Sequence, residues 1–316
     1  MMFKKILMIG FDKNDLEQEY WDRINKITEE LVMLAKDSPD ILKHLSNTDC
    51  LLVKIGATVN KKTMDNAPNL KYIGVFGTGY GKIDTEYATD KGIAVCNIAG
   101  YSTEAVAEFA FAIILEQLRD LERGKKQARN TNYSESTFFN VYEIKAKKFG
   151  IIGLGRIGSR IAEIALGFGA DVRYWSRTRK KEYETKGIRY QEIETVLAEC
   201  DFLSLNLALN KEMEGFLNGS RIEKIKSGAV VINLAPMELV DIDALAKRLE
   251  KGDITFMLDH SDEMTPEQLK QLTKCKNCIV YPPIAYTTKE ATSEKQEAFA
   301  NNLENFLKGT PTNKVN

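Results

Sequence analysis

Short apolar runs alternate with charged stretches of helical period along the whole chain. In the first hundred residues, the predicted strands are 5–9, 50–54, 72–76 and 94–96. A second series begins at residue 148, and its predicted strands are 149–153, 171–175, 202–207, 229–233, 256–259 and 278–281. The charged stretch 14–33 predicts a helix. Strands that alternate with helices are typical of α/β proteins with parallel sheets.

Two longer helices frame this second series. One is predicted from about residue 102 to residue 124, with Ser102 or Thr103 as its N-cap. The other, over 289–307, ends the chain and is expected to return to the first domain. Between the first helix and the second series, residues 129–141 are polar and predict a linker. A length of 316 residues fits two domains at roughly 150 residues each.

Composition and charge exclude several classes of protein. Lys and Arg together number 44 against 45 Asp and Glu, a net charge of −1 that offers no footprint for nucleic acid or an anionic membrane. The apolar run 105–115 is too short to span a bilayer and contains Glu108. Five cysteines predict no disulfide framework, and Cys275-x-x-Cys278 lacks the second pair that a zinc site needs, so no metal is expected. We expect a cytoplasmic protein.

A glycine-rich loop is the most informative segment. It reads Gly153-Leu154-Gly155-Arg156-Ile157-Gly158. A predicted strand enters this loop, an apolar-periodic helix leaves it, and a second strand follows at 171–175, which is the context of a dinucleotide-binding loop. The first glycine allows a tight turn, the second lets backbone approach a pyrophosphate, and the third lets helix and strand pack closely. The alternative is a tight turn without a ligand.

The residues after the second strand bear on the choice of cofactor. They are Ser176, Arg177, Thr178 and Arg179. A carboxylate here would hydrogen-bond the 2′-hydroxyl of NAD, whereas a hydroxyl and guanidinium groups would bind the 2′-phosphate of NADP. We therefore expect NADP(H) to be preferred over NAD(H). The alternative is a solvated basic loop.

Several motifs in order resemble one family over essentially the whole chain. They are Ala67-Pro68-Asn69-Leu70-Lys71, Gly77-Thr78-Gly79-Tyr80, Val106-Ala107-Glu108, the glycine loop and Ser176-Arg177-Thr178-Arg179. These motifs resemble the D-2-hydroxyacid dehydrogenases, including glyoxylate and hydroxypyruvate reductases. The resemblance implies two Rossmann-like α/β domains, with a dinucleotide-binding domain (101–285) inserted into a flavodoxin-like substrate domain (1–100 plus 286–316). It also implies a homodimer.

The resemblance extends the set of expected site residues. For the cofactor, it adds Leu207, Leu234, Ala235 and Asp259, the last beside the nicotinamide amide. For the substrate cleft between the domains, it implies Ile55, Gly56, Gly79 and Tyr80.

The family's three catalytic side chains are missing from this chain. Pro236 stands where the resemblance places the arginine that holds the substrate carboxylate, and Pro283 where it places the histidine that transfers the proton. Met264 stands where it places the glutamate that orients this histidine, although a shift of one residue would offer Glu263. His260 is the nearest remaining titratable candidate.

Tyr286 is a second candidate for proton transfer. Two functional hypotheses follow from these losses. In the first, the protein is a divergent oxidoreductase acting on a small molecule that need not be a carboxylate, such as a cationic imine. In the second, it is a catalytically dead cofactor-binding protein that acts as a sensor or scaffold. Turnover that consumes NADPH distinguishes the two.

Overall fold

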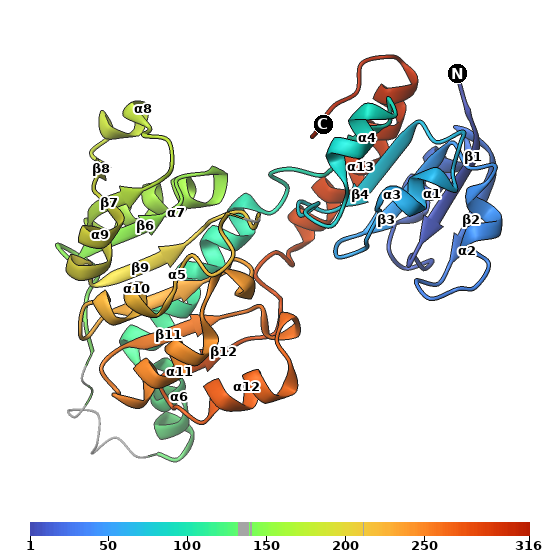
Figure 1. The fold of residues 1–316 in the computed structure, drawn as a ribbon. Helices are drawn as coiled ribbons and strands as arrows, with labels where there is room; N and C mark the ends of the chain where they lie inside the picture. Colours follow the sequence, from blue (N-terminus) through green and yellow to red (C-terminus); the bar gives the residue numbers. More distant parts are fainter. Residues whose placement is uncertain (132–138, 140, 211) are drawn as a thin grey trace. The chain divides into compact units, whose positions relative to one another are not determined.

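The chain folds into two compact α/β units, which Figure 1 shows as ribbons and which we describe separately. The computed structural model describes residues 1–131, 139, 141–210 and 212–316. Unit 1 comprises Met1–Ser102 and Thr288–Asn316, and unit 2 comprises Thr103–Thr287. Both junctions lie two residues further along the chain than the sequence predicts. The predicted linker 129–141 lies largely outside the described residues.

Unit 1 is built on a five-stranded parallel sheet. Its strands are β1 (Phe3–Ile9), β2 (Thr28–Leu34), β3 (Cys50–Lys54), β4 (Tyr72–Phe76) and β5 (Ala94–Cys96). The order β2-β1-β3-β4-β5 is the flavodoxin-like order of a doubly wound sheet, which confirms the predicted fold class. The inner strands β3 and β4 are buried along almost their whole length, as expected for a parallel sheet covered on both faces.

Helices cover both faces of this sheet. On one face, α1 (Gln18–Asn25) packs with the last helix, α13 (Lys289–Leu307). On the other lie α2 (Ile41–Leu45), α3 (Lys61–Asp65) and α4 (Thr85–Asp90). The last stretch of the chain therefore belongs to the unit that its first hundred residues form (Figure 1).

The edge strand β2 corrects a sequence-based prediction. The charged stretch 14–33 predicts one helix, but α1 ends at Asn25 and β2 begins at Thr28. Because β2 lies at the sheet edge, the side chains of Glu29 and Glu30 remain exposed, and their charge hides the strand from a search for apolar runs.

Unit 2 is built on a seven-stranded parallel sheet. Its strands are β6 (Lys148–Ile152), β7 (Asp171–Trp175), β8 (Arg189–Tyr190), β9 (Phe202–Leu205), β10 (Val230–Asn233), β11 (Thr255–Leu258) and β12 (Cys278–Val280). They follow the order β12-β11-β10-β9-β6-β7-β8. From β6 the chain adds strands first on one side (β7, β8) and then on the other (β9 to β12), so the strand order reverses between β6 and β9. Open α/β sheets bind ligands at such a reversal.

Two layers of helices enclose the second sheet. One contains α5 (Thr103–Arg119) and α7 (Arg156–Gly167), and the other contains α9 (Ile193–Glu199), α10 (Gly219–Lys224), α11 (Ile242–Glu250) and α12 (Pro266–Thr273). The shorter elements are α6 (Leu121–Arg129), α8 (Lys181–Glu184) and the 3-10 turns η2 (Met237–Leu239) and η3 (Ser261–Glu263).

The predicted helix 102–124 is in fact two helices. Asp120 has a left-handed backbone with φ of 48°, which ends α5 and separates it from α6. Within the described ranges, no helix combines the length and the apolar composition that crossing a membrane requires.

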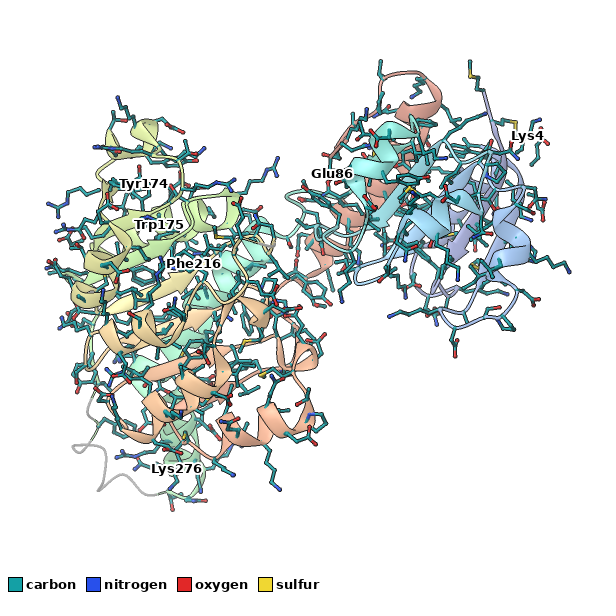
Figure 2. The ribbon with its side chains drawn as sticks, in the orientation of Figure 1. Lys4, Glu86, Tyr174, Trp175, Phe216 and Lys276 are labelled. Carbon is teal, nitrogen blue, oxygen red and sulfur yellow. The ribbon has the colours of Figure 1, made fainter. Side chains whose placement is uncertain are left out.

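Each unit contains one of the two tryptophans, so unfolding of each unit has its own reporter. Trp21 is buried in unit 1, and Trp175 packs against Phe216 in unit 2 with ring centroids 5.0 Å apart (Figure 2). We expect Phe299→Ala, which empties a buried ring position on α13, to lower the free energy of unfolding of unit 1 by about 3–5 kcal/mol. Trp21 fluorescence during urea unfolding, in a Trp175→Phe background, measures this loss.

Phe168→Ala in unit 2 is the matched control because the Phe168 ring is 40% exposed. It should leave the Trp21 transition unchanged. Equal effects of the two variants on Trp21 would contradict the independent packing of α13 in unit 1.

Candidate functional site

The structure brings the predicted cofactor residues to one edge of the unit 2 sheet. They follow the carboxyl ends of successive strands: 153–158 after β6, 176–179 after β7, Leu207 after β9, Leu234 and Ala235 after β10, and Asp259 after β11. Because all seven strands are parallel, these ends share one edge. The sequence prediction thus selects residues that the fold places together.

Two glycines of the loop are required by the protein's own packing. Gly153 has φ of 98°, and a Cβ atom there would lie 2.8 Å from the carbonyl oxygen of Asn206, beyond β9. A Cβ atom at Gly158 would overlap the carbonyl oxygen of Gly153, so only glycine lets α7 approach the end of β6 this closely. These two positions explain the turn without any ligand.

Gly155 needs a different explanation. It has an ordinary φ of −87°, and apart from its own chain neighbours and the nearby helix backbone no described atom lies within 4 Å of where its Cβ would be. It is also the N-cap of α7 and supplies no side-chain cap, so backbone N–H groups of the first helical turn lack the usual partner. Open space beside these uncapped N–H groups fits the pyrophosphate of a dinucleotide.

Asp259 offers a second feature that fits a cofactor. Its side chain is only 1% exposed, and Oδ2 accepts a hydrogen bond from the backbone N–H of Ala285 at 3.1 Å. Its other oxygen, Oδ1, has no hydrogen-bond partner among the described residues. Burial raises the pKa of this carboxyl group. A buried oxygen without a donor fits the amide of a nicotinamide, the role that the resemblance implies.

His260 lies between two carboxylates. Its Nδ1 is 3.3 Å from Oε1 of Glu263, and its Nε2 is 3.6 Å from Oδ1 of Asp259. Burial lowers the pKa of His260, but the hydrogen bond with Glu263 and the charge of Asp259 outweigh burial and raise the pKa to about 9. At neutral pH, His260 is therefore an imidazolium, and with its two neighbours it forms a group with one net negative charge.

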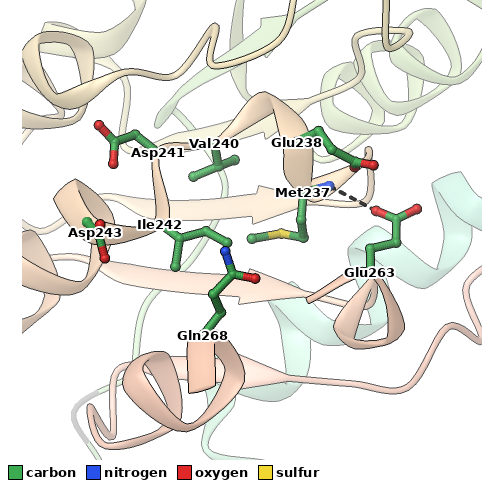
Figure 3. A pocket seen from close by; sticks show the side chains of 8 residues that line it. All are labelled: Met237, Glu238, Val240, Asp241, Ile242, Asp243, Glu263 and Gln268. Carbon is green, nitrogen blue, oxygen red and sulfur yellow. Dashed lines mark hydrogen bonds between the residues drawn. The ribbon is translucent and has the colours of Figure 1, made fainter. Parts of the chain in front are cut away.

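The same contacts connect the loops after β10, β11 and β12. Figure 3 shows Oε2 of Glu263 accepting a hydrogen bond from the backbone N–H of Met237, at 2.9 Å. With the bond from Ala285 to Asp259, this joins the loops that contain Pro236, Met264 and Pro283. Both donors are backbone N–H groups, so no side-chain pattern in the sequence identifies them.

Residues 263 and 264 have different surroundings in the structure. Glu263 contacts His260, whereas Met264 packs against the hydrophobic core beneath α11 and α12. That Pro236, Met264 and Pro283 occupy the family's catalytic positions stays a prediction. Tyr286 is 40% exposed, and burial of part of its ring together with Asp262 and Asp259 raises its pKa.

A cavity of about 220 Å³ lies beside Glu263 (Figure 3). Its lining residues are Met237, Glu238, Val240, Asp241, Ile242, Asp243, Glu263 and Gln268. Asp241 and Gln268 already serve α11 and α12, because each bonds a backbone N–H at the helix start. None of the predicted cofactor residues lines this cavity. In the part of the chain that the structure describes, no group of His, Cys, Asp and Glu could hold a metal ion.

The two arginines after β7 differ in how they are engaged. Arg179 donates two hydrogen bonds to Glu184, both at 2.6 Å, and Arg179 lowers the pKa of Glu184 to about 2. Arg177 is 71% exposed and has only a 3.5 Å contact with the exposed Glu212. Ser176 donates to the carbonyl of Thr178 at 2.6 Å. Of the two guanidinium groups, Arg177 is therefore the more accessible.

The predicted substrate residues lie at the corresponding edge of unit 1. Ile55 and Gly56 follow β3, while Gly79 and Tyr80 follow β4. The Ile55 side chain covers Gly77, where any Cβ atom would overlap it. All four residues are exposed on this unit.

The fold and the glycine loop together define an α/β protein with a doubly wound dinucleotide-binding unit. A family model described as "D-isomer specific 2-hydroxyacid dehydrogenase, NAD binding domain" matches residues 111–285. This match covers more than half of the chain, and the chain therefore belongs to the D-isomer specific 2-hydroxyacid dehydrogenase family. The resemblance seen in the sequence motifs is confirmed, and a nicotinamide dinucleotide is the cofactor that this family's domain binds.

Individual relatives extend the similarity over most of the chain. The glyoxylate reductase of Thermococcus litoralis is 37% identical over 284 residues, which is 87% of this chain and 86% of the relative. The D-lactate dehydrogenase of Aquifex aeolicus, solved with NAD and lactic acid, has a TM-score of 0.85 at 27% identity over 96% of both chains. An acyclic imino acid reductase, solved with NADPH and D-Arg, has a TM-score of 0.85 at 26% identity over 99% of this chain and 100% of its own.

The glycine loop yields a prediction that separates folding from binding. Because nothing surrounds the Cβ position of Gly155, Gly155→Ala should change the free energy of unfolding by less than about 0.5 kcal/mol. The added methyl group should nevertheless weaken dinucleotide binding about tenfold, equivalent to about 1.4 kcal/mol. Calorimetric titration with NADPH and urea unfolding measure the two effects.

Gly158→Ala is the matched comparison. Its Cβ atom meets backbone, so this variant should be destabilised as well as impaired in binding. If Gly155→Ala binds NADPH as tightly as the wild type, the dinucleotide does not lie against Gly155.

His260 yields a prediction about pH. Its pKa in the folded protein, about 9, lies above the ordinary value of 6.5, so its contribution to stability is complete below pH 6.5 and is lost as pH rises through 9. We expect the loss to be at most about 3.5 kcal/mol, since one pKa unit corresponds to about 1.4 kcal/mol. Urea unfolding at pH 6 and pH 10, for the wild type and His260→Gln, isolates this contribution.

Imidazole NMR provides an independent check because the chain has only two histidines. His44→Gln assigns the remaining signal to His260. Titration of that signal near pH 6.5 would contradict the arrangement of His260 between Asp259 and Glu263.

Proposed function

We propose that the protein is an NADPH-dependent reductase of carbon–nitrogen double bonds. The observation that carries this proposal is the composition of the three connected loops after β10, β11 and β12. They contain Pro236, Met264 and Pro283, and in the loop after β11 two carboxylates hold a histidine. These loops suit a cationic acceptor better than a 2-oxo acid.

Reduction of a 2-oxo acid makes two demands that Pro236, Met264 and Pro283 do not meet. The carbonyl oxygen needs a proton donor, and the carboxylate needs a cation beside it. Proline has neither a side-chain donor nor a charge, and general acid–base catalysis is typically worth about 10²–10⁴ in rate. Ordinary reduction of glyoxylate or hydroxypyruvate is therefore disfavoured.

A protonated imine removes the first demand, for a proton donor at the reacting centre. Its nitrogen already has a proton and a positive charge, so addition of hydride to carbon gives a neutral amine directly. When bound, a nicotinamide dinucleotide supplies that hydride. Asp259, His260 and Glu263 together bear one net negative charge, which stabilises a cationic acceptor relative to a neutral or anionic one. The similarity to an acyclic imino acid reductase supports the same class of acceptor.

The residues that would hold NADPH lie along the carboxyl edge of unit 2. Uncapped N–H groups at the start of α7, beside Gly155, would bind the pyrophosphate. Ser176 and the accessible Arg177 would bind the 2′-phosphate. Oδ1 of Asp259, which accepts no hydrogen bond from a described residue, would accept one from the nicotinamide amide.

Turnover tests the proposal directly. We expect oxidation of NADPH, followed at 340 nm, when pyruvate and methylamine are supplied together so that their imine forms in solution. Pyruvate or glyoxylate alone should react at least about 100-fold more slowly, the smaller effect expected where a general acid is absent. Chromatography of the product should show N-methylalanine formed in equal amount to the NADP⁺.

The same assay is run with a panel of 2-oxo acids and amines of different size, because this one imine need not fit the site. Equal rates with and without amine would contradict the proposed acceptor. Tight NADPH binding without turnover on any member of the panel would support a cofactor-binding protein that has lost catalysis.

Cofactor preference rests on Arg177. We expect Arg177→Gln to weaken NADPH binding about tenfold, because a charge-assisted hydrogen bond to phosphate contributes about 1.5–3 kcal/mol. NADH binding should not change. Arg179→Gln is the matched control, since Glu184 already engages that guanidinium, and it should affect NADPH binding less. Wild-type affinity for NADH equal to that for NADPH would overturn the preference.

A further inference from the structure

We propose that Lys295 on α13 is an anion-binding residue of unit 1 and takes the carboxylate of the substrate. The identity of that substrate as a carboxylate-bearing imine rests on the function proposed above. The anion site itself rests on contacts within unit 1. Lys295 lies on the final helix, α13, and none of the motifs singled out in the sequence includes it.

Lys295 lies at the part of the unit 1 sheet where ligands bind in folds of this kind. The winding of the sheet reverses between β1 and β3. Phe11 follows β1, Lys54 ends β3, and Phe76 ends β4, so all three belong to the carboxyl edge around this reversal. Ligand sites of doubly wound sheets occur at such an edge.

Aromatic rings form the floor beneath Lys295. The Phe76 ring lies 5.5 Å from that of Phe11 and 4.9 Å from that of Phe299, measured between centroids. The ammonium nitrogen of Lys295 is 4.1 Å from the centre of the Phe76 ring, and that of Lys54 is 5.8 Å from the centre of the Phe11 ring. Two ammonium groups therefore lie over one continuous aromatic surface.

The two lysines differ in how their charges are balanced. Lys54 forms an ion pair with Asp15, with nitrogen and oxygen 2.7 Å apart. Lys295 forms no ion pair or hydrogen bond with any described residue, and its ammonium group lies over the rings of Phe76 and Tyr101. Burial and the neighbouring charge of Lys54 lower the pKa of Lys295, although Asp15 acts in the opposite direction.

A partly buried ammonium without an acceptor favours an anionic ligand. Ring faces attract a cation but accept no ordinary hydrogen bond, so the three N–H groups of Lys295 retain donors for a carboxylate. At the edge of unit 2, His260 is already matched by Asp259 and Glu263, and positions 236, 264 and 283 offer no cation. Within unit 1, the unused donors of Lys295 therefore favour a carboxylate ligand.

Protection from chemical labelling tests the site without any turnover. The full-length protein is labelled with a trace of acetic anhydride, with and without sodium oxamate, a carboxylate that cannot form an imine with lysine. Peptide mass spectrometry then gives the acetylation rate of each lysine. We expect saturating oxamate to slow acetylation of Lys295 about tenfold relative to chloride of equal ionic strength. Lys289, at the exposed start of the same helix, is the internal control and should be unaffected.

Variants of the same helix identify the responsible group. Lys295→Met keeps the length of an apolar stem on the aromatic floor and should weaken oxamate binding at least about tenfold in calorimetric titration. Lys295→Arg keeps the charge and should retain binding within about threefold, and Lys289→Met should bind like the wild type. Equal protection of Lys289 and Lys295, protection of neither, or tighter binding of inorganic phosphate than of oxamate would overturn the carboxylate site.

Kinetics with the imine of pyruvate and methylamine separate this inference from the proposed function. Lys295→Met should raise KM about tenfold and leave kcat within about twofold, because the lost contact holds a part of the substrate away from the reacting bond. Oxamate protection without any turnover would retain the anion site and reject the proposed reaction. Turnover with an unchanged KM in Lys295→Met would retain the reaction and reject the anion site.

Discussion

The approach of α7 to the end of β6 determines what the carboxyl edge of unit 2 can do. Only glycine at 153 and 158 permits this approach, and its consequence is an uncapped helix start beside open space at Gly155. The seven parallel strands then bring the loops after β10, β11 and β12 to the same edge. Two glycines of the motif, Gly153 and Gly158, are thus required by packing within the protein, whereas Gly155 is not. This third glycine is the part of the motif that protein packing alone does not explain.

At the same edge of the sheet, the contacts around His260 connect neighbouring loops. Asp259 and Glu263 each contact the imidazolium with one oxygen and a backbone N–H of a neighbouring loop with the other. The histidine is therefore held by charge, and the loops of Met237 and Ala285 are held by the carboxylates. At neutral pH this imidazolium keeps its proton, since its pKa is about 9. Under the proposed function, the carboxylates around it would also attract a substrate that has its own positive charge.

The sequence predicted those helices and strands whose apolar positions follow from burial alone. Strand β7 and helix α13 were predicted with their observed bounds, because their apolar positions have no competing explanation. The edge strand β2 was missed because exposed charges break its apolar run, and the helix break at Asp120 depends on one left-handed residue that no periodicity shows. The candidate site was predictable only to the level of segments. Which arginine after β7 remains accessible depends on Glu184, a partner from the following helix.

The two units differ in the charge that their carboxyl edges leave unbalanced. In unit 2, two carboxylates surround one imidazolium, which leaves a net negative charge. In unit 1, the Lys54–Asp15 pair is neutral and Lys295 adds an ammonium group without a carboxylate partner among the described residues. The substrate class that we propose, a protonated imino acid, has one group of each sign, a cationic C=N group and an anionic carboxylate. A 2-oxo acid has only the anionic group. The proposal of an imino acid therefore rests on charge as well as on the missing proton donor.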